Sequence, residues 1–131
     1  MIYTTKPIAV RYVETDKMQF VHHSNYPKYF ELARIEWLAK LGVSYASIEK
    51  EGILLPVVSI KTEFKHPLFF GDEFRITVSL KKPPKATLEF DYHVINQHNH
   101  IICEGNTILA FLSSKKNRPI RCPEFLSMLF T

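Results

Sequence analysis

The stretch RYVETDKMQFVHHSNYPKYFELARIE, residues 11–36, joins a polar loop to the start of an amphipathic helix. Asp16 lies in the loop, and His23 follows seven residues later, where we expect the helix to begin. A carboxylate aimed at a helix N-terminus can attack an acyl carbon while the helix amides stabilise the developing oxyanion. The stretch therefore favours acyl-transfer chemistry.

The helix is predicted over residues 26–41. Ser24 or Asn25 can supply its N-cap, and Pro27 suits the first turn because its missing N–H has no helical partner there. Gly42 is a typical residue just beyond a helix end. The apolar side chains form one stripe, made of Tyr26, Tyr29, Phe30, Ala33, Trp37, Leu38 and Leu41. A stripe this wide must be buried, and a sheet is the expected partner.

The rest of the chain has the alternation of strands. Residues 7–13 are β-prone and predict a first strand, with Tyr12 on the same face as Ile8 and Val10. After a short helical segment at 44–51, which Gly52 closes, strands are predicted over residues 54–65, 73–81, 86–96 and 101–113. Their short connections favour an antiparallel meander. We therefore expect one α+β domain, residues 1–131, in which a curled antiparallel sheet wraps a long central helix.

Composition excludes several function classes. Apolar residues make up 46% of the 131 residues and charged residues 23%, with no segment long enough to cross a membrane and no visible secretory signal. We therefore expect a cytoplasmic protein without membrane insertion. Cys103 and Cys122 lack metal or disulfide spacing. The formal charge of +4 is dispersed, which disfavours nucleic-acid binding and suits an anionic small molecule.

A family resemblance follows from these residues. Residues 12–34 resemble the signature of hotdog-fold acyl-CoA thioesterases of the 4-hydroxybenzoyl-CoA thioesterase-like group. The similarity extends through HPLFFGDEFRITV (66–78), EGNTILAFL (104–112) and RPIRCP (118–123). Gln19 departs from the pattern, because many members have glycine there, a residue that accepts positive φ. The signature positions are met by Tyr12, Asp16, His23, Tyr26, Tyr29, Glu31, Ala33 and Arg34.

The resemblance implies a hotdog fold and hydrolysis of an acyl-CoA thioester to a free acid and coenzyme A. A thiolate is a good leaving group, since thiol pKa values lie near about 8.5, so no strong general acid is required. Asp16 would act as nucleophile or as general base toward water. The backbone amide at His23 would stabilise the oxyanion, and its imidazole would orient Asp16 or the water. Tyr12 would line the pocket and hydrogen-bond Asp16 or the substrate.

Each of these residues also has a simpler structural interpretation. Asp16 can form an Asx-turn, His23 a local hydrogen bond, and Tyr12 part of the core. Glu31 can assist catalysis, but an ion pair with Arg34 or Lys28 is favoured by the helical spacing. A metal site at His22 and His23 is not expected, because adjacent histidines usually point apart.

The expected partners are the substrate and further copies of the chain. Lys61, Lys65, Lys81 and Lys82 are candidates for binding the phosphates of coenzyme A, although exposed lysines are often only solvated. The resemblance implies a homodimer or homotetramer with active sites between subunits and no cofactor. Alternative functions are hydrolysis of acyl-carrier-protein thioesters, dehydration of 3-hydroxyacyl thioesters, and acyl-CoA binding without catalysis.

Overall fold

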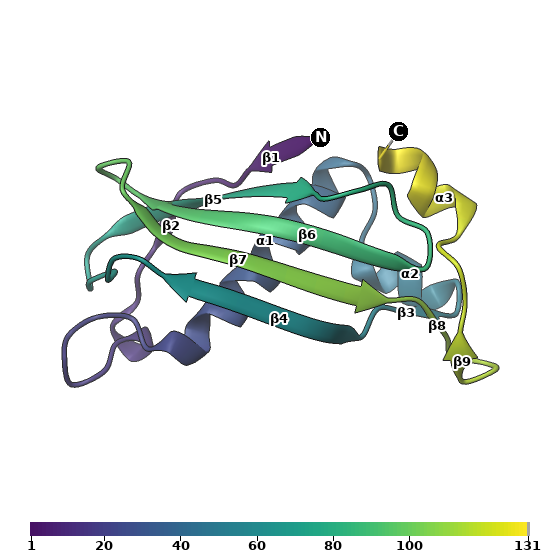
Figure 1. Cartoon of the computed structure of the whole chain (residues 1–131), viewed down its shortest axis with the longest axis horizontal. Helices are drawn as coiled ribbons and strands as arrows, with labels where there is room; N and C mark the ends of the chain where they lie inside the picture. The colour runs from purple at the N-terminus through teal and green to yellow at the C-terminus, as the bar shows by residue number, and fades with distance from the viewer. Residues whose placement is uncertain (131) are drawn as a thin grey trace.

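The computed structural model describes residues 1–130, and its central element is a 15-residue helix, α1, that lies against one face of an antiparallel sheet (Figure 1). The helices are α1 (Tyr26–Lys40), α2 (Tyr45–Lys50) and α3 (Glu124–Ser127), and 3-10 turns lie at Tyr12–Glu14, His23–Asn25 and Met128–Phe130. The strands are β1 (Ile2–Thr4), β2 (Ile8–Ala9), β3 (Ile53–Leu54), β4 (Val57–Phe64), β5 (Glu73–Leu80), β6 (Thr87–Asn96), β7 (Ile101–Ala110), β8 (Leu112–Ser113) and β9 (Arg118–Pro119). The expected α+β arrangement is confirmed.

Helix α1 buries the predicted stripe. Six of the seven predicted residues, all except Leu41, are buried against the sheet, and Arg34 is buried with them. Pro27 lies in the first turn, and Gly42 follows the helix with a φ of 88°. That backbone conformation is readily available to glycine and explains why the helix ends there.

The four long strands predicted from the sequence are present, but their order differs from a simple meander. The main sheet has the order β1-β5-β6-β7-β4, with β2 also paired to β5. Strands β5, β6 and β7 form the expected meander, whereas β4 pairs with β7 rather than with its successor β5. The 66–72 connection therefore crosses from one edge of the sheet to the other side of β6. As a result, β4 is an edge strand.

The predicted first strand over residues 7–13 is mostly wrong. Only Ile8 and Ala9 are in a strand, and the chain then turns through the 3-10 segment Tyr12–Glu14. The physical reason is local, because the Glu14 carboxylate accepts the backbone N–H of Arg11 at 2.8 Å and satisfies a donor that a strand would have used. Tyr12 consequently leaves the core and is 76% exposed.

The edge strand β4 leaves apolar side chains uncovered. In its register with β7, Ile60 lies opposite Thr107 and Phe64 opposite Cys103, so both side chains point toward the helix side of the sheet. They are nevertheless 47% and 53% exposed. An unpaired edge with an apolar face is a ready surface for pairing with another strand.

Among residues 1–130, no helix is long and apolar enough to cross a membrane.

Candidate functional site

The candidate site is built on a tight loop, residues 15–21, that precedes helix α1. Thr15 and Val21 form an isolated antiparallel bridge, and the backbone N–H of Asp16 donates to the carbonyl of Phe20 at 3.0 Å. The turn is closed by the N–H of Gln19, which donates to the Asp16 carbonyl at 2.9 Å. Gln19 has a φ of 71°, a left-handed conformation that favours glycine. The loop therefore keeps a glycine-type backbone at the position where this chain departs from the family pattern.

Asp16 is half-buried, and its two carboxylate oxygens differ. Oδ1 accepts the backbone N–H of Met18 at 2.8 Å, which is the Asx-turn that the simpler interpretation predicted. Oδ2 accepts no hydrogen bond from any residue between 1 and 130. One oxygen thus fixes the side chain while the other remains available to a water or an acyl carbon.

The start of α1 supplies backbone amides. Helix α1 is preceded by the 3-10 turn His23–Asn25, and the His22 ring caps this turn by accepting the N–H of Ser24 at 3.2 Å. The N–H of His23 has no acceptor within the described chain. It is therefore a free donor at a helix N-terminus, the kind of group that stabilises an oxyanion.

The two histidines do not point apart as expected. The ring centroids of His22 and His23 lie 4.1 Å apart with 32° between the planes, with His22 as the extended residue just before the 3-10 turn that His23 begins. His22 Nδ1 is also 2.8 Å from the Ser24 hydroxyl. Within residues 1–130, no group of three His, Cys, Asp or Glu side chains has an arrangement that could hold a metal ion.

Glu14 connects the loop to the helix, and sequence reasoning missed it. Its backbone carbonyl accepts the N–H of His22 and the side-chain amide of Asn25, both at 2.9 Å. Asn25 occupies the N-cap position of α1 but makes no side-chain capping bond, since its amide is directed to Glu14 instead. In the sequence, the only indication of this role was that Glu14 is an acidic residue directly after the β-prone residues 7–13.

Tyr12 lies on the surface beside this loop rather than at a strand end. Its ring packs edge-on against Phe70 with the centroids 5.6 Å apart, and its carbonyl accepts the N–H of Thr15. No hydrogen bond joins the Tyr12 hydroxyl to Asp16 within residues 1–130. A hydrogen bond to Asp16, one of the two roles expected for Tyr12, is therefore not formed, and the simpler alternative of a core position is wrong.

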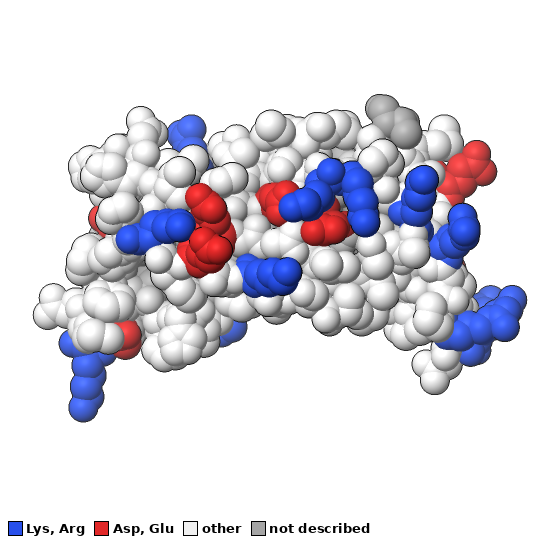
Figure 2. Space-filling view, in the orientation of Figure 1, with Lys and Arg blue, Asp and Glu red and all other residues white. Residues whose placement is uncertain are grey.

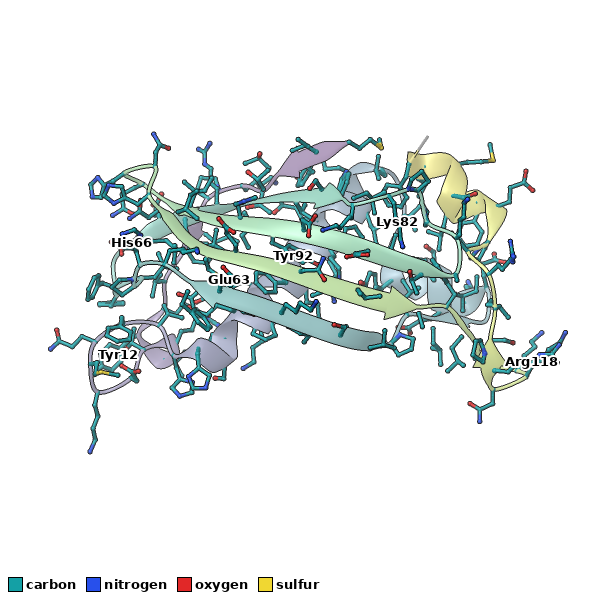
Figure 3. All side chains as sticks on the ribbon, in the orientation of Figure 1. Tyr12, Glu63, His66, Lys82, Tyr92 and Arg118 are labelled. Atoms are coloured by element: carbon teal, nitrogen blue, oxygen red, sulfur yellow. The ribbon has the colours of Figure 1, made fainter. Side chains whose placement is uncertain are left out.

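The four candidate lysines do not converge on Asp16. Lys61 and Lys65 belong to β4 and the residue just after it, and Lys65 pairs with Glu63 at 3.2 Å. Lys81 and Lys82 follow β5, at the opposite end of the molecule from Tyr12 (Figure 3). The outer sheet face mixes acidic side chains over its middle with basic ones around them and at the α3 end (Figure 2). On the face that Figure 2 shows, the basic side chains are interrupted by acidic ones.

Two other candidates have structural roles. Glu31 is 4.0 Å from the buried guanidinium of Arg34, which confirms the expected ion pair. Arg34 also donates to the hydroxyls of Tyr45 and Tyr92. Cys103 is fully buried on β7, and burial raises its pKa to about 12, so little reactive thiolate forms at neutral pH.

Comparison with known proteins decides the family. The sequence model of the thioesterase-like superfamily matches residues 10–130 of this chain. The chain belongs to this superfamily. This thioesterase is 30% identical to the Bacillus subtilis (strain 168) protein named "Putative acyl-CoA thioesterase YneP", over 92% of this chain and 88% of that one.

Solved structures of other thioesterases share its fold. A DHNA-CoA thioesterase from Staphylococcus aureus superposes with a TM-score of 0.86 at 32% identity, over 92% of this chain and 80% of that one. A 4-hydroxybenzoyl-CoA thioesterase, in complex with 4-hydroxybenzoyl-CoA, has a TM-score of 0.87 at 16% identity, over 99% of both chains. The thioesterase thus has the hotdog fold that the resemblance implied.

Proposed function

We propose that this thioesterase hydrolyses an acyl-CoA thioester to a free carboxylic acid and coenzyme A, with Asp16 as the acting carboxylate. The observation that supports this most is that two groups of the motif are unused within residues 1–130. Asp16 Oδ2 accepts no hydrogen bond, and the N–H of His23, in the 3-10 turn that precedes α1, donates none. Relatives named as acyl-CoA and DHNA-CoA thioesterases support the substrate class.

The chemistry needs little more than these two groups. In one route, Asp16 Oδ2 bonds to the acyl carbon, the C–S bond breaks, coenzyme A leaves as a thiolate, and water then cleaves the acyl-aspartyl anhydride. In the other route, Asp16 removes a proton from water as the water oxygen bonds to the acyl carbon, and the C–S bond then breaks, so that coenzyme A leaves as a thiolate and the carboxylic acid is formed directly. In both, the carbonyl oxygen gains negative charge that the His23 N–H and the helix N-terminus stabilise.

We assign supporting roles to two side chains. The His23 imidazole, which is exposed and lies beside His22, would orient the attacking water or the thioester. The Tyr12 hydroxyl would contact the substrate at the pocket entrance, because it lies on the surface beside the loop.

The active site is proposed to lie between two subunits paired along β4. The exposed apolar side chains of Val57, Ile60 and Phe64 would be buried by such pairing, and the unpaired edge would gain backbone hydrogen bonds. A cavity of about 400 Å³ on the isolated subunit is lined instead by residues of β1, β5 and β6 and by neither Asp16 nor His23. A second copy would thus help to enclose the acyl group.

Pairing also gives the candidate lysines a role. When two β4 strands run antiparallel, each subunit turns its 81–85 loop toward the end of the sheet where its partner carries the Asp16 loop. Lys61 and Lys65 would meet the phosphates of coenzyme A from β4, and Lys81 and Lys82 would act across the subunit boundary. Two such dimers could associate into a tetramer.

The test is thiol release from a panel of acyl-CoAs with aliphatic and aromatic acyl groups, compared with the same groups on an acyl-carrier protein. We expect turnover of at least one acyl-CoA and slower release from the carrier protein. Faster release from the carrier protein would favour that substrate class, and tight acyl-CoA binding without release would favour a binding module. A dehydratase would instead consume 3-hydroxyacyl thioesters and lose more activity from Glu31→Gln than from Asp16→Asn.

A further inference from the structure

Glu14 is a buried acid two residues ahead of Asp16, with an exposed fraction of 8%. Burying a carboxylate is unfavourable unless hydrogen bonds compensate for the lost water. Glu14 Oε1 accepts the Arg11 backbone N–H at 2.8 Å, and Oε2 lies 3.2 Å from the Arg11 guanidinium. The Arg11 side chain is 73% exposed, so solvent weakens this ion pair, and the bond to the backbone matters more for holding the turn.

The main chain of Glu14 contacts the other part of the site, the 3-10 turn that contains His23. Its carbonyl accepts both the N–H of His22 and the amide of Asn25, each at 2.9 Å. These donors flank His23, whose own N–H is free. The side chain of Glu14 therefore fixes the turn before Asp16, while its carbonyl fixes the turn that presents the His23 amide.

The Glu14 carboxylate also faces the first turns of α1. The Tyr29 hydroxyl is buried there, and its pKa is raised first by burial, then by the negative charge of Glu14 and by its hydrogen-bonding interaction with that carboxylate. The hydroxyl lies near the Glu14 carboxylate but makes no well-aligned hydrogen bond with any residue from 1 to 130. A buried acid is thus retained beside a buried phenol, and neither group gains stability from burial unless hydrogen bonds compensate for the lost water.

We infer that Glu14 is a positioning residue, which holds the Asp16 loop against the start of α1 so that Asp16 Oδ2 and the His23 N–H address the same thioester carbonyl. The inference rests on the proposed function and assigns a role to a residue that neither touches the substrate nor reacts. Small displacements of reacting groups are costly, because about 1 Å of misplacement can lower a rate by about 100-fold.

The test compares four variants under single-substrate kinetics with an acyl-CoA that the wild type turns over. Glu14→Ala removes both side-chain contacts, whereas Glu14→Gln keeps an acceptor for the Arg11 N–H. Asn25→Ser removes the donor to the Glu14 carbonyl and preserves a good N-cap residue. Glu51→Ala is the matched control, an exposed acid at the end of α2. Amide hydrogen exchange of residues 15–23 and thermal unfolding are measured on each.

We expect Glu14→Ala and Asn25→Ser to lower kcat by about 10- to 100-fold, with little change in KM and faster exchange confined to residues 15–23. Glu14→Gln should recover most of kcat, and Glu51→Ala should match the wild type. If Glu14→Ala fails to fold, Asn25→Ser still tests the inference, because Asn25 makes no side-chain capping bond that the substitution would remove.

The inference is overturned if Asn25→Ser keeps full kcat, if exchange increases equally throughout the chain, or if Glu14→Gln loses as much kcat as Glu14→Ala. These outcomes are distinct from failure of the proposed function. In that case the wild type releases no thiol from any acyl-CoA, or Asp16→Asn is as active as the wild type.

Discussion

The ring of Phe30 on α1 packs directly against Gly105 on β7, in the space that a β-carbon at residue 105 would occupy. The same ring stacks on Tyr92, the partner of Gly105 across the sheet, with the centroids 4.4 Å apart. This contact sets how closely the helix approaches the middle of the sheet.

Gly105→Ala should therefore destabilise the protein, because the new methyl group forces the Phe30 ring or the helix to move. We expect a loss of about 1–3 kcal/mol in the free energy of unfolding, measured by chemical denaturation. The double variant Gly105→Ala with Phe30→Leu should be more stable than its two separate losses would predict. Additive losses would contradict the close packing.

Tyr29→Phe should leave stability unchanged or raise it by up to about 1 kcal/mol, because the buried hydroxyl that it removes lies near the Glu14 carboxylate but makes no well-aligned hydrogen bond in residues 1–130. Tyr92→Phe is the matched control. The Tyr92 hydroxyl accepts from Arg34 at 3.2 Å and lies 2.6 Å from the Thr107 hydroxyl, so its removal should cost about 1–3 kcal/mol. Equal losses in the two variants would show that the Tyr29 hydroxyl is bonded after all.

Gln19→Gly should relieve the left-handed backbone at a φ of 71°, whereas Gln19→Ala should not. Thermal unfolding should therefore rank the glycine variant above the alanine variant, by about 1 kcal/mol. The same pair tests selectivity, because Gln19 lies in the Asp16 turn: a shift in preferred acyl group shared by both variants would come from loss of the side chain. A more stable alanine variant would argue against the observed turn.

The sequence predicted the helix and the four long strands well, because their periodicity records which side chains are buried. In β5, Phe74, Ile76 and Val78 alternate with more exposed residues, and all three are buried. The pairing of β4 with β7 could not be predicted from this periodicity. Alternation identifies a buried face but not the neighbouring strand, and a short connection can still cross the sheet.

The site was predicted less completely than the fold. Asp16 and the amide at His23 follow from the motif, since a loop carboxylate before a helix has a recognisable pattern. Glu14 was missed because its carbonyl makes the essential bonds, and any residue type has a carbonyl. The displacement of Tyr12 from the core follows from one side-chain contact, Glu14 to the Arg11 N–H, that periodicity does not encode.

Pairing along β4 predicts that Ile60→Lys shifts the protein toward monomers. The charge would lie in the buried apolar face of the proposed interface, where an unpaired lysine is unfavourable. Ile2→Lys is the control, since Ile2 is 72% exposed on the opposite edge strand β1. Sedimentation velocity should show a smaller species only for Ile60→Lys, with a parallel loss of thiol release. An unchanged oligomer in Ile60→Lys would place the interface elsewhere.

The most direct test of the central claim is thiol release by Asp16→Asn beside Asp72→Asn. Both aspartates accept a backbone N–H at 2.8 Å within a loop, from Met18 and Phe69 respectively, so the two substitutions disturb similar turns. Asparagine keeps the acceptor but lacks the negative charge. We predict that Asp16→Asn lowers kcat by about 100-fold or more while acyl-CoA binding, measured by calorimetry, is retained, and that Asp72→Asn stays near the wild type. Wild-type turnover by a folded Asp16→Asn variant would contradict the assignment of Asp16.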